Sequence, residues 1–271
     1  SSHHRKALLM FSFLVHALFA ALLSSVCLAL FSPFVTLRRV SYLGEALSHI
    51  AFAGIALALL LGLNLQFTTL IFVIAVALAI TWLARRRQLQ EANTITIFLS
   101  VSMALGIILI SLRRGYSFDL ASYLFGNVLL ASSADLWMLG ILMTVNIGFI
   151  AFFYKELFYL SYNPDLAAFY RLPVRMVDRL FMILLAANIV ITLRAAGIIL
   201  VSAQLILPAA TAFNLVKRLD HAVVACAFIA ILAATGGFAL SWWLNLPTSA
   251  NIVLLEFLLY LFSLLFRPRS A

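Results

Sequence analysis

The sequence predicts an all-α integral membrane protein that crosses the bilayer about nine times. Apolar residues make up 65% of the 271 residues and charged residues only 10%, against about 45–50% and about 25% in soluble domains. The apolar residues form runs of about 20, the length at which a helix spans about 30 Å of hydrocarbon. Basic residues stand in small groups between these runs, for example at 85–87 and 217–218. We therefore expect residues 1–271 to form a single transmembrane domain, with Ser1–His4 as an expression-tag remnant.

Nine apolar runs are long enough, or nearly long enough, to cross the membrane as helices. The stretch 120–131 is too short to cross, and we expect it to dip into one face of the membrane or to lie along it. The longest polar connection, from Lys155 to Arg179, is expected to be a cytoplasmic loop with a short helix. In chain order the nine runs cover about 8–34, 40–63, 67–84, 95–112, 136–154, 180–193, 196–213, 222–244 and 252–266.

The apolar stretch from Leu180 to Phe213 is too long for one span. It is interrupted only at Arg194, and a continuous helix of this length would extend about 51 Å. We therefore expect the chain to turn between Arg194 and Gly197, which makes one of the two spans short, broken or re-entrant.

The distribution of the basic residues predicts the orientation of the chain. Nine crossings place the two ends on opposite sides of the membrane. With the N-terminus outside, 13 of the 18 Lys and Arg residues fall in cytoplasmic segments, as the positive-inside rule requires. We therefore expect the N-terminus outside and the C-terminus in the cytoplasm. The net charge of +9 then reflects membrane topology, and no nucleic-acid partner is expected.

Two further observations limit the chemistry of the chain. Cys27 and Cys226 both lie within apolar runs, which is typical of small buried residues rather than of a disulfide or a reactive thiolate. The sequence has no G-x-x-x-x-G-K-[ST] phosphate loop and no H-E-x-x-H or G-x-S-x-G motif. We therefore expect a transport subunit rather than an enzyme, with no permanently bound cofactor and with its energy supplied elsewhere.

Glu45 and His49 are the strongest candidates for a functional site. They lie four residues apart in the second predicted span, so both project from one side of a helix. His49 lies about 15 Å beyond Arg39 at helical rise, near the middle of the bilayer. A carboxylate and an imidazole are ordinary ligands of Zn²⁺ and also suit Mn²⁺ and Fe²⁺. A hydrogen bond that only stabilises the helix is a weak reason to place both groups at that depth.

Other polar side chains in the predicted spans are weaker candidates. Glu256 lies near mid-depth in the last span. It is either a further metal or proton group or a protonated acid that faces a neighbouring helix. His16 and Gln204 are expected to bond to neighbouring helices, and His221, beside Asp220, is expected to be structural.

The stretch around Glu45 and His49 resembles the signature of a known family. Residues 38–54, RRVSYLGEALSHIAFAG, are similar to that signature in the membrane permeases of bacterial ATP-driven zinc, manganese and iron importers. In that family an aspartate commonly occupies the position of Glu45. Arg171 stands where the family usually has a glycine. Further similar stretches are 119–129, DLASYLFGNVL, the loop motif 163–167, NPDLA, and 197–212, GIILVSAQLILPAATA.

The resemblance implies a permease of the bacterial inner membrane with three partners. These are a cytoplasmic ATP-binding subunit, an extracytoplasmic metal-binding protein and a second permease copy that completes a homodimer. It further implies a short coupling helix that docks in a groove of the ATP-binding subunit. Taken alone, the proline and the small residues of this segment also fit a kinked span with a basic end. The coupling residues are Pro208, Ala209, Ala210, Thr211, Ala212, Lys217 and Arg218.

The resemblance also bears on the cargo. Manganese and iron permeases more often carry a proline just before the position of Gly54, where this chain has Ala53. The transported ion is therefore expected to be Zn²⁺, with Mn²⁺ or Fe²⁺ as the alternative.

Two other classes of function stay open at the level of the sequence. A proton-coupled secondary metal transporter or a cation channel would use Glu45, His49 and Glu256 as a relay, and it would work without an ATP-binding subunit. An intramembrane metalloenzyme is less favoured, because no second histidine lies at helical spacing from His49.

Overall fold

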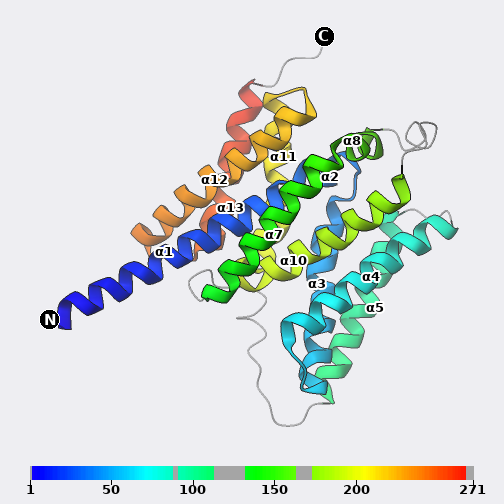
Figure 1. Cartoon of the computed structure of the whole chain (residues 1–271), viewed down its shortest axis with the longest axis horizontal. Coiled ribbons are helices and arrows are strands. Elements are labelled where there is room, and N and C mark those ends of the chain that lie inside the picture. The colour runs from blue at the N-terminus through cyan, green and yellow to red at the C-terminus, as the bar shows by residue number, and fades with distance from the viewer. Residues whose placement is uncertain (1, 88–90, 113–131, 163–172, 267–271) are drawn as a thin grey trace. The chain divides into compact units, whose positions relative to one another are not determined.

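The fold is all-helical throughout the described part of the chain, as predicted. The computed structural model describes residues 2–87, 91–112, 132–162 and 173–266. The predicted short segment 120–131 and the motif 163–167 therefore lie outside the described residues. The helices are α1 (Ser2–Ala29), α2 (Ser32–Leu37), α3 (Ser41–Leu61), α4 (Leu65–Arg87), α5 (Glu91–Ser111), α7 (Ser133–Phe152), α8 (Tyr154–Tyr162), α10 (Val174–Gln204), α11 (Leu207–Leu215), α12 (Leu219–Leu244) and α13 (Thr248–Ser263), followed by the 3₁₀ turn η2 (Leu264–Phe266) (Figure 1).

Eight helical segments of the described chain are long and apolar enough to cross a membrane. They account for the nine predicted runs, because the segment Val174–Leu215 contains both the sixth and the seventh. The chain is thus a multi-pass membrane protein. The short helix predicted in the loop after Lys155 is also present, as α8.

The predicted break in the long apolar stretch falls at Gly197. Its φ of 79° and ψ of 165° are not helical, although residues on both sides of it are. A residue without a Cβ adopts a positive φ at little cost, which explains why the interruption falls here. A second break, at Leu205 and Ile206, separates α10 from α11, and Pro208 occupies the first turn of α11. Proline is tolerated there because the first-turn N–H groups of a helix have no partner within it.

The chain forms two compact units. The first contains Ser1–Pro33, Ala121–Val145 and Thr192–Ala271, and the second contains Phe34–Leu120 and Asn146–Ile191. Three helices, α2, α7 and α10, run from one unit into the other. That the whole chain acts as a single permease domain stays a prediction.

The first unit is built from small residues packed between α1, α10, α12 and α13. Its core cluster contains five alanines, at 20, 21, 196, 233 and 234, together with Leu200 and Ile252. Small residues allow membrane helices to approach closely. One such close approach is at Gly237 of α12, where an added Cβ would lie 2.6 Å from the Cα of Ile252. Cys27 and Cys226 are fully buried in this unit and do not form a disulfide, as predicted.

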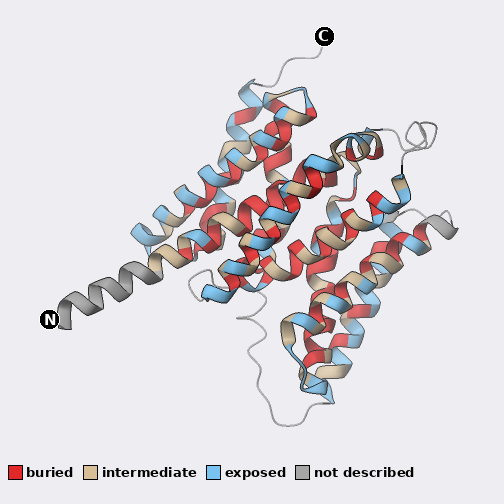
Figure 2. Ribbon diagram, in the orientation of Figure 1, coloured by how far each residue is buried: buried red, intermediate tan, exposed pale blue. Residues whose placement is uncertain are grey.

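The second unit places α3 against α4 and α5, which lie beside it (Figure 1). Most of α3 is buried (Figure 2). Gly54 of α3 lies so close to α4 that an added Cβ would be 2.9 Å from the Cα of Thr69. Asn146 and Asn188 are both fully buried and hydrogen-bond each other reciprocally, at 2.7 and 3.0 Å. This pair joins α7 to α10 inside the unit.

Candidate metal site and coupling segment

Glu45 and His49 lie on a side of α3 that the described part of the chain leaves partly uncovered. Of the 21 residues of α3, 13 are buried, including Ala46, Leu47 and Ile50 on either side of the pair. Glu45 is exposed and His49 is half-buried. Tyr42, one turn before Glu45, is 42% exposed. The two residues therefore share one side of α3, as helical spacing predicts, and this side is a polar stripe in the first half of a helix that is mostly buried.

The start of α3 is held by a buried ion pair. The Arg38 guanidinium donates a hydrogen bond to the carboxylate of Asp178 on α10, and the two side chains are only 10% and 1% exposed. The same guanidinium lies 4.8 Å from the ring centroid of Phe181, a cation–π contact. Arg39 adopts a φ of 59°, which turns the chain between α2 and α3. Together these contacts fix the angle at which α3, and with it the Glu45 and His49 face, enters the unit.

One copy of the chain does not assemble a full metal site in the part that the structure describes. No group of three or more His, Cys, Asp and Glu residues there is arranged to hold a metal ion. One copy thus offers Glu45 and His49 as two candidate ligands, whereas a structural or catalytic Zn²⁺ site needs at least three from the protein. A closed site at this pair would need further ligands from outside the described part of the chain.

Among the weaker candidates, His16 and His221 have local contacts, whereas the bond expected from Gln204 to a neighbouring helix is not found, because neither polar atom of its side chain has a hydrogen-bond partner among the described residues. His16 of α1 lies 3.4 Å from the hydroxyl of Ser133 on α7, which fits the prediction that it bonds to a neighbouring helix. The His221 ring is 4.0 Å from the carboxylate of Asp220 at the start of α12, and that carboxylate also accepts hydrogen bonds from Arg218. Glu256 lies on α13, in the first unit, and is fully buried.

The predicted coupling segment, residues 208–218, is joined to α2 through a hydroxyl that the sequence did not single out. Ser32, fully buried at the start of α2, donates a hydrogen bond of 3.0 Å to the carbonyl of Leu205. It accepts another, of 3.1 Å, from the backbone N–H of Ala209. The hydroxyl therefore bridges the break between α10 and α11 and gives a partner to one free group on each side of it.

Most of the predicted coupling residues face the interior of the first unit. Pro208, Ala209, Thr211 and Ala212 are buried, and Ala210 is half-buried. The exposed part of the segment is its end, at Leu215, Lys217 and Arg218. If this segment touches a partner, that end carries the contact, while the small residues let α11 pack against α12 and α13.

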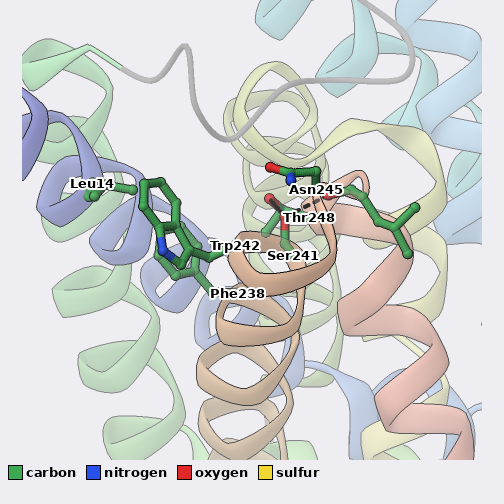
Figure 3. Close-up of a pocket in the computed structure, with 7 residues that line it drawn as sticks. Leu14, Phe238, Ser241, Trp242, Asn245 and Thr248 are labelled. Carbon is green, nitrogen blue, oxygen red and sulfur yellow. Dashed lines mark hydrogen bonds between the residues drawn. The ribbon is translucent and has the colours of Figure 1, made fainter.

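A separate pocket lies at the turn between α12 and α13. It encloses about 250 Å³ and is lined by Leu14, Phe238, Ser241, Trp242, Asn245, Leu246 and Thr248. The indole of Trp242 lies next to Leu14 on one side, and the hydroxyls of Ser241 and Thr248, 2.8 Å apart, lie on the other (Figure 3). None of the seven lining residues is an acid, a histidine or a cysteine, so this pocket is not a metal site.

Comparison with known proteins places the chain in a family. The sequence profile of the ABC 3 transport family matches residues 10–267. The chain belongs to the ABC 3 transport family. The match includes both the Glu45 and His49 face and the coupling segment. The resemblance noted in the sequence is thereby confirmed at the level of the family.

Two proteins with similar sequences carry names that refer to metals, and one solved structure is also similar to this chain. The manganese transport system membrane protein MntC of Listeria monocytogenes is 35% identical over 265 residues, which cover 98% of this chain and 94% of that protein. The high-affinity zinc uptake system membrane protein ZnuB of Haemophilus influenzae is 28% identical over 260 residues, which cover 96% and 100%. The solved structure of PsaBC from Streptococcus pneumoniae in complex with Fab matches with a TM-score of 0.83 and 29% identity, over 99% of this chain and 96% of that chain.

Proposed function

We propose that this chain is the membrane permease of an ATP-driven importer of divalent transition-metal ions. The ion would pass from an extracytoplasmic binding protein, through the permease, to the cytoplasm. The observation that carries the proposal is the uncovered side of α3, where Glu45 and His49 stand together on a helix of which 13 of 21 residues are buried. The names of the manganese and zinc relatives support the same class of cargo.

The chemistry of the pair suits transient binding of a metal ion. An imidazole nitrogen and a carboxylate oxygen are good ligands for Zn²⁺ and Mn²⁺. Two ligands from one chain bind more weakly than a closed site, and a transported ion must be released again. The exposed stripe that contains Tyr42, Glu45 and His49 offers the pair to an ion that approaches from outside the chain.

A second copy of the permease would complete the site. Two chains related by a two-fold axis, each with its α3 stripe turned toward the axis, would supply two carboxylates and two imidazoles. This homodimer also explains why an acid stays exposed on a helix of a membrane protein, where exposure to lipid is costly.

The energy would come from a separate cytoplasmic ATP-binding subunit. The exposed end of the coupling segment, at Leu215, Lys217 and Arg218, is the surface that we assign to its docking. The orientation with the N-terminus outside puts this end in the cytoplasm, where the positive-inside rule also expects the basic residues.

The identity of the ion is the finer part of the proposal. The residues before Gly54 favour Zn²⁺, whereas the manganese system MntC of Listeria monocytogenes has a higher identity to this chain, 35%, than the zinc system ZnuB, 28%. Both ions accept one carboxylate and one imidazole ligand. The uptake experiment described next therefore measures both Zn²⁺ and Mn²⁺.

The test is metal uptake by the complete transporter in proteoliposomes. The permease is reconstituted with its own ATP-binding subunit and binding protein, and uptake of Zn²⁺ and Mn²⁺ is measured with and without ATP. We expect ATP-dependent uptake, which falls to background in H49A and E45Q while gel filtration still shows the assembled complex. H221A is the matched control, because His221 is a histidine at a helix end outside the stripe, and it should transport like the wild type.

Two results would overturn parts of the proposal. Unchanged uptake in H49A would remove the α3 stripe from the ion path. Uptake by the permease alone, with no ATP-binding subunit and no ATP, would favour the proton-coupled transporter or channel instead.

A further inference from the structure

Helix α13 carries a polar stripe toward the protein interior, although it is one of the most lipid-exposed spans. Its buried residues are Thr248, Asn251, Ile252, Glu256 and Ser263, of which only Ile252 is apolar. Its exposed side carries large apolar residues, including Leu254, Leu258 and Phe262. This pattern is expected of a membrane helix that turns polar groups away from lipid. The polar stripe therefore needs partners inside the first unit.

The two ends of the stripe have such partners. Near the start of α13, the hydroxyl of Thr248 lies 2.8 Å from that of Ser241 on α12. At the other end, Ser263 accepts a hydrogen bond of 2.9 Å from the side-chain amide of Asn214 on α11. These bonds fix α13 against both neighbouring helices.

The middle of the stripe is different. Glu256 and Gln204 are both fully buried. The Gln204 side chain is the polar neighbour of the Glu256 carboxyl. Yet no pair of their atoms meets the geometry of a hydrogen bond, and among the described residues neither side chain has any other hydrogen-bond partner. A buried carboxyl and a buried amide thus stand next to each other with their bonding capacity unused.

Among the described side chains, no positive charge is positioned to neutralise this carboxyl. The titratable or charged groups on α13 and on the helices packed with it are Tyr260 of α13, Cys226, Asp220 and His221 of α12, Arg194 of α10, and His16 and Cys27 of α1. The other charged residues of α10, Arg175, Asp178 and Arg179, lie near its opposite end, in the second unit. Arg194 is paired with Asp135 at 3.4 Å, and Asp220 and His221 lie at the far, cytoplasmic start of α12. Lys217 and Arg218, after α11, are exposed. Of these groups, Cys226 interacts with Glu256, and a thiol brings no positive charge.

We propose that Glu256 is an intramembrane proton site, in which the carboxyl keeps one proton and pairs with the Gln204 amide. A carboxylic acid and a primary amide are complementary, because each has one donor and one acceptor that face the other. The acid O–H donates to the Gln204 carbonyl oxygen, and the Gln204 amide N–H donates to the acid carbonyl. An ionised carboxylate has no donor, so it would leave the Gln204 oxygen unsatisfied and would also be a bare charge in a dry interior.

The position of Gln204 gives the proton a mechanical role. Gln204 is the last residue of α10, directly before the break that Ser32 bridges. The acid–amide pair would join α13 to the end of α10 at the point where α11 begins. The protonated pair would then keep the start of the coupling segment in a fixed position against α13. This role would not depend on a metal ion at Glu45 and His49.

The direct test is infrared spectroscopy of the purified full-length permease in lipid nanodiscs. We expect the absorption band of a protonated carboxyl at neutral pH, shifted by deuterium exchange, and lost in E256Q. The matched control E156Q changes a half-buried acid of α8 outside the predicted spans, and the band should remain. In Q204L the band should remain but move to higher frequency, because the acid loses its hydrogen-bond partner.

A second measurement separates a proton site from a metal ligand. The side-chain amide introduced by E256Q has an N–H donor and a carbonyl acceptor that can pair with Gln204. The melting temperature of E256Q and its ATP-dependent metal uptake should therefore stay close to those of the wild type. E256A, which leaves Gln204 alone, should lower the melting temperature. A band that is absent at neutral pH, a band that disappears when Zn²⁺ or Mn²⁺ is added, or loss of uptake in a folded E256Q would each overturn the proposal. The infrared result does not depend on transport, so it stands or fails apart from the proposed import function.

Discussion

The hydroxyl of Ser32 shows how much a single side chain contributes in this protein. It is fully buried, and it bonds to one backbone group on each side of the break between α10 and α11, at Leu205 and at Ala209. Removing it leaves a buried carbonyl and a buried N–H without partners, and each such group costs about 1–3 kcal/mol. We therefore expect S32A to lower the free energy of unfolding in detergent by about 1–3 kcal/mol, because local relaxation recovers part of the loss.

S24A is the matched control for this prediction. Ser24 is equally buried, but its hydroxyl donates only to the carbonyls of Ala20 and Ala21 in its own helix. The Ala20 carbonyl also lies within the regular bonding of the helix, so no backbone group is left alone. S24A should therefore unfold nearly like the wild type. Equal destabilisation of the two variants would contradict the role that we give to Ser32.

Contacts between residues that are close in the sequence could be predicted, whereas contacts between distant residues could not. Glu45 and His49 lie four residues apart on one helix, so helical spacing alone placed them on one side. Arg38 and Asp178 are 140 residues apart, and Ser32 and Leu205 are 173 apart. Nothing in the local sequence around Ser32 or Asp178 indicates the partner, because each contact depends on how distant helices pack. These positioning residues therefore became visible only in the structure.

At the scale of the helices, close packing of α12 on α13 depends on one of two adjacent glycines. A Cβ at Gly237 would lie 2.6 Å from the Cα of Ile252 and 2.7 Å from its backbone nitrogen, which cannot move without displacing α13. A Cβ at Gly236 would meet only the end of the Leu255 side chain, at 2.5 Å, which can rotate away. We therefore expect replacement of glycine by alanine to have different effects on stability at positions 236 and 237.

G237A should lower the stability of the protein by about 1–3 kcal/mol, the usual cost of overpacking. G236A should be neutral or slightly stabilising, because alanine favours a helix by up to about 1 kcal/mol over glycine. Melting temperatures of the two variants, measured side by side in the same detergent, check this. A similar decrease for both would mean that α13 does not sit against Gly237 as the structure has it.

The helices themselves were largely predictable, and the exceptions have physical causes. Length arithmetic required a break in the stretch 180–213, and Arg194 and Gly197 located it. The second break, before Pro208, was read from sequence only as a weakened helix, because a proline is compatible with a kinked span as well as with a new helix start. The first helix begins at Ser2 and ends at Ala29 rather than spanning 8–34, since apolar runs do not mark caps.

At the scale of the whole molecule, the chain has its apolar residues on both the inside and the outside. Only 22% of the residues in the membrane-spanning stretch of α5 are buried within the described chain, and the same holds for α13. Trp243 and Leu265 are 83% and 78% exposed. Such surface is stable only in lipid or against another chain. This is why composition alone predicted the class of protein. Composition carries no information about the polar stripe of α3, whose partner we infer to be a second copy.

The orientation of the molecule in the membrane is predicted by its charges and can be tested at the two ends of α12. This helix has 26 residues, about 39 Å at helical rise, so its ends must lie on opposite sides of the bilayer. Arg218, before α12, and Leu246, after it, are both exposed. With the N-terminus outside and eight crossings before the α12–α13 turn, a cysteine at 218 faces the cytoplasm and one at 246 faces outward.

We expect a membrane-impermeant maleimide to label L246C in intact spheroplasts and R218C only in inside-out vesicles. The permease is expressed without its ATP-binding subunit, so that docking does not shield position 218. Cys27 and Cys226 are fully buried, so they can stay in place without reacting, and the wild type serves as the unlabelled control. The reverse labelling pattern would place the end of the coupling segment outside the cell. That position would contradict its proposed docking to a cytoplasmic ATP-binding subunit. Labelling of both positions from one side would mean that α12 does not span the bilayer.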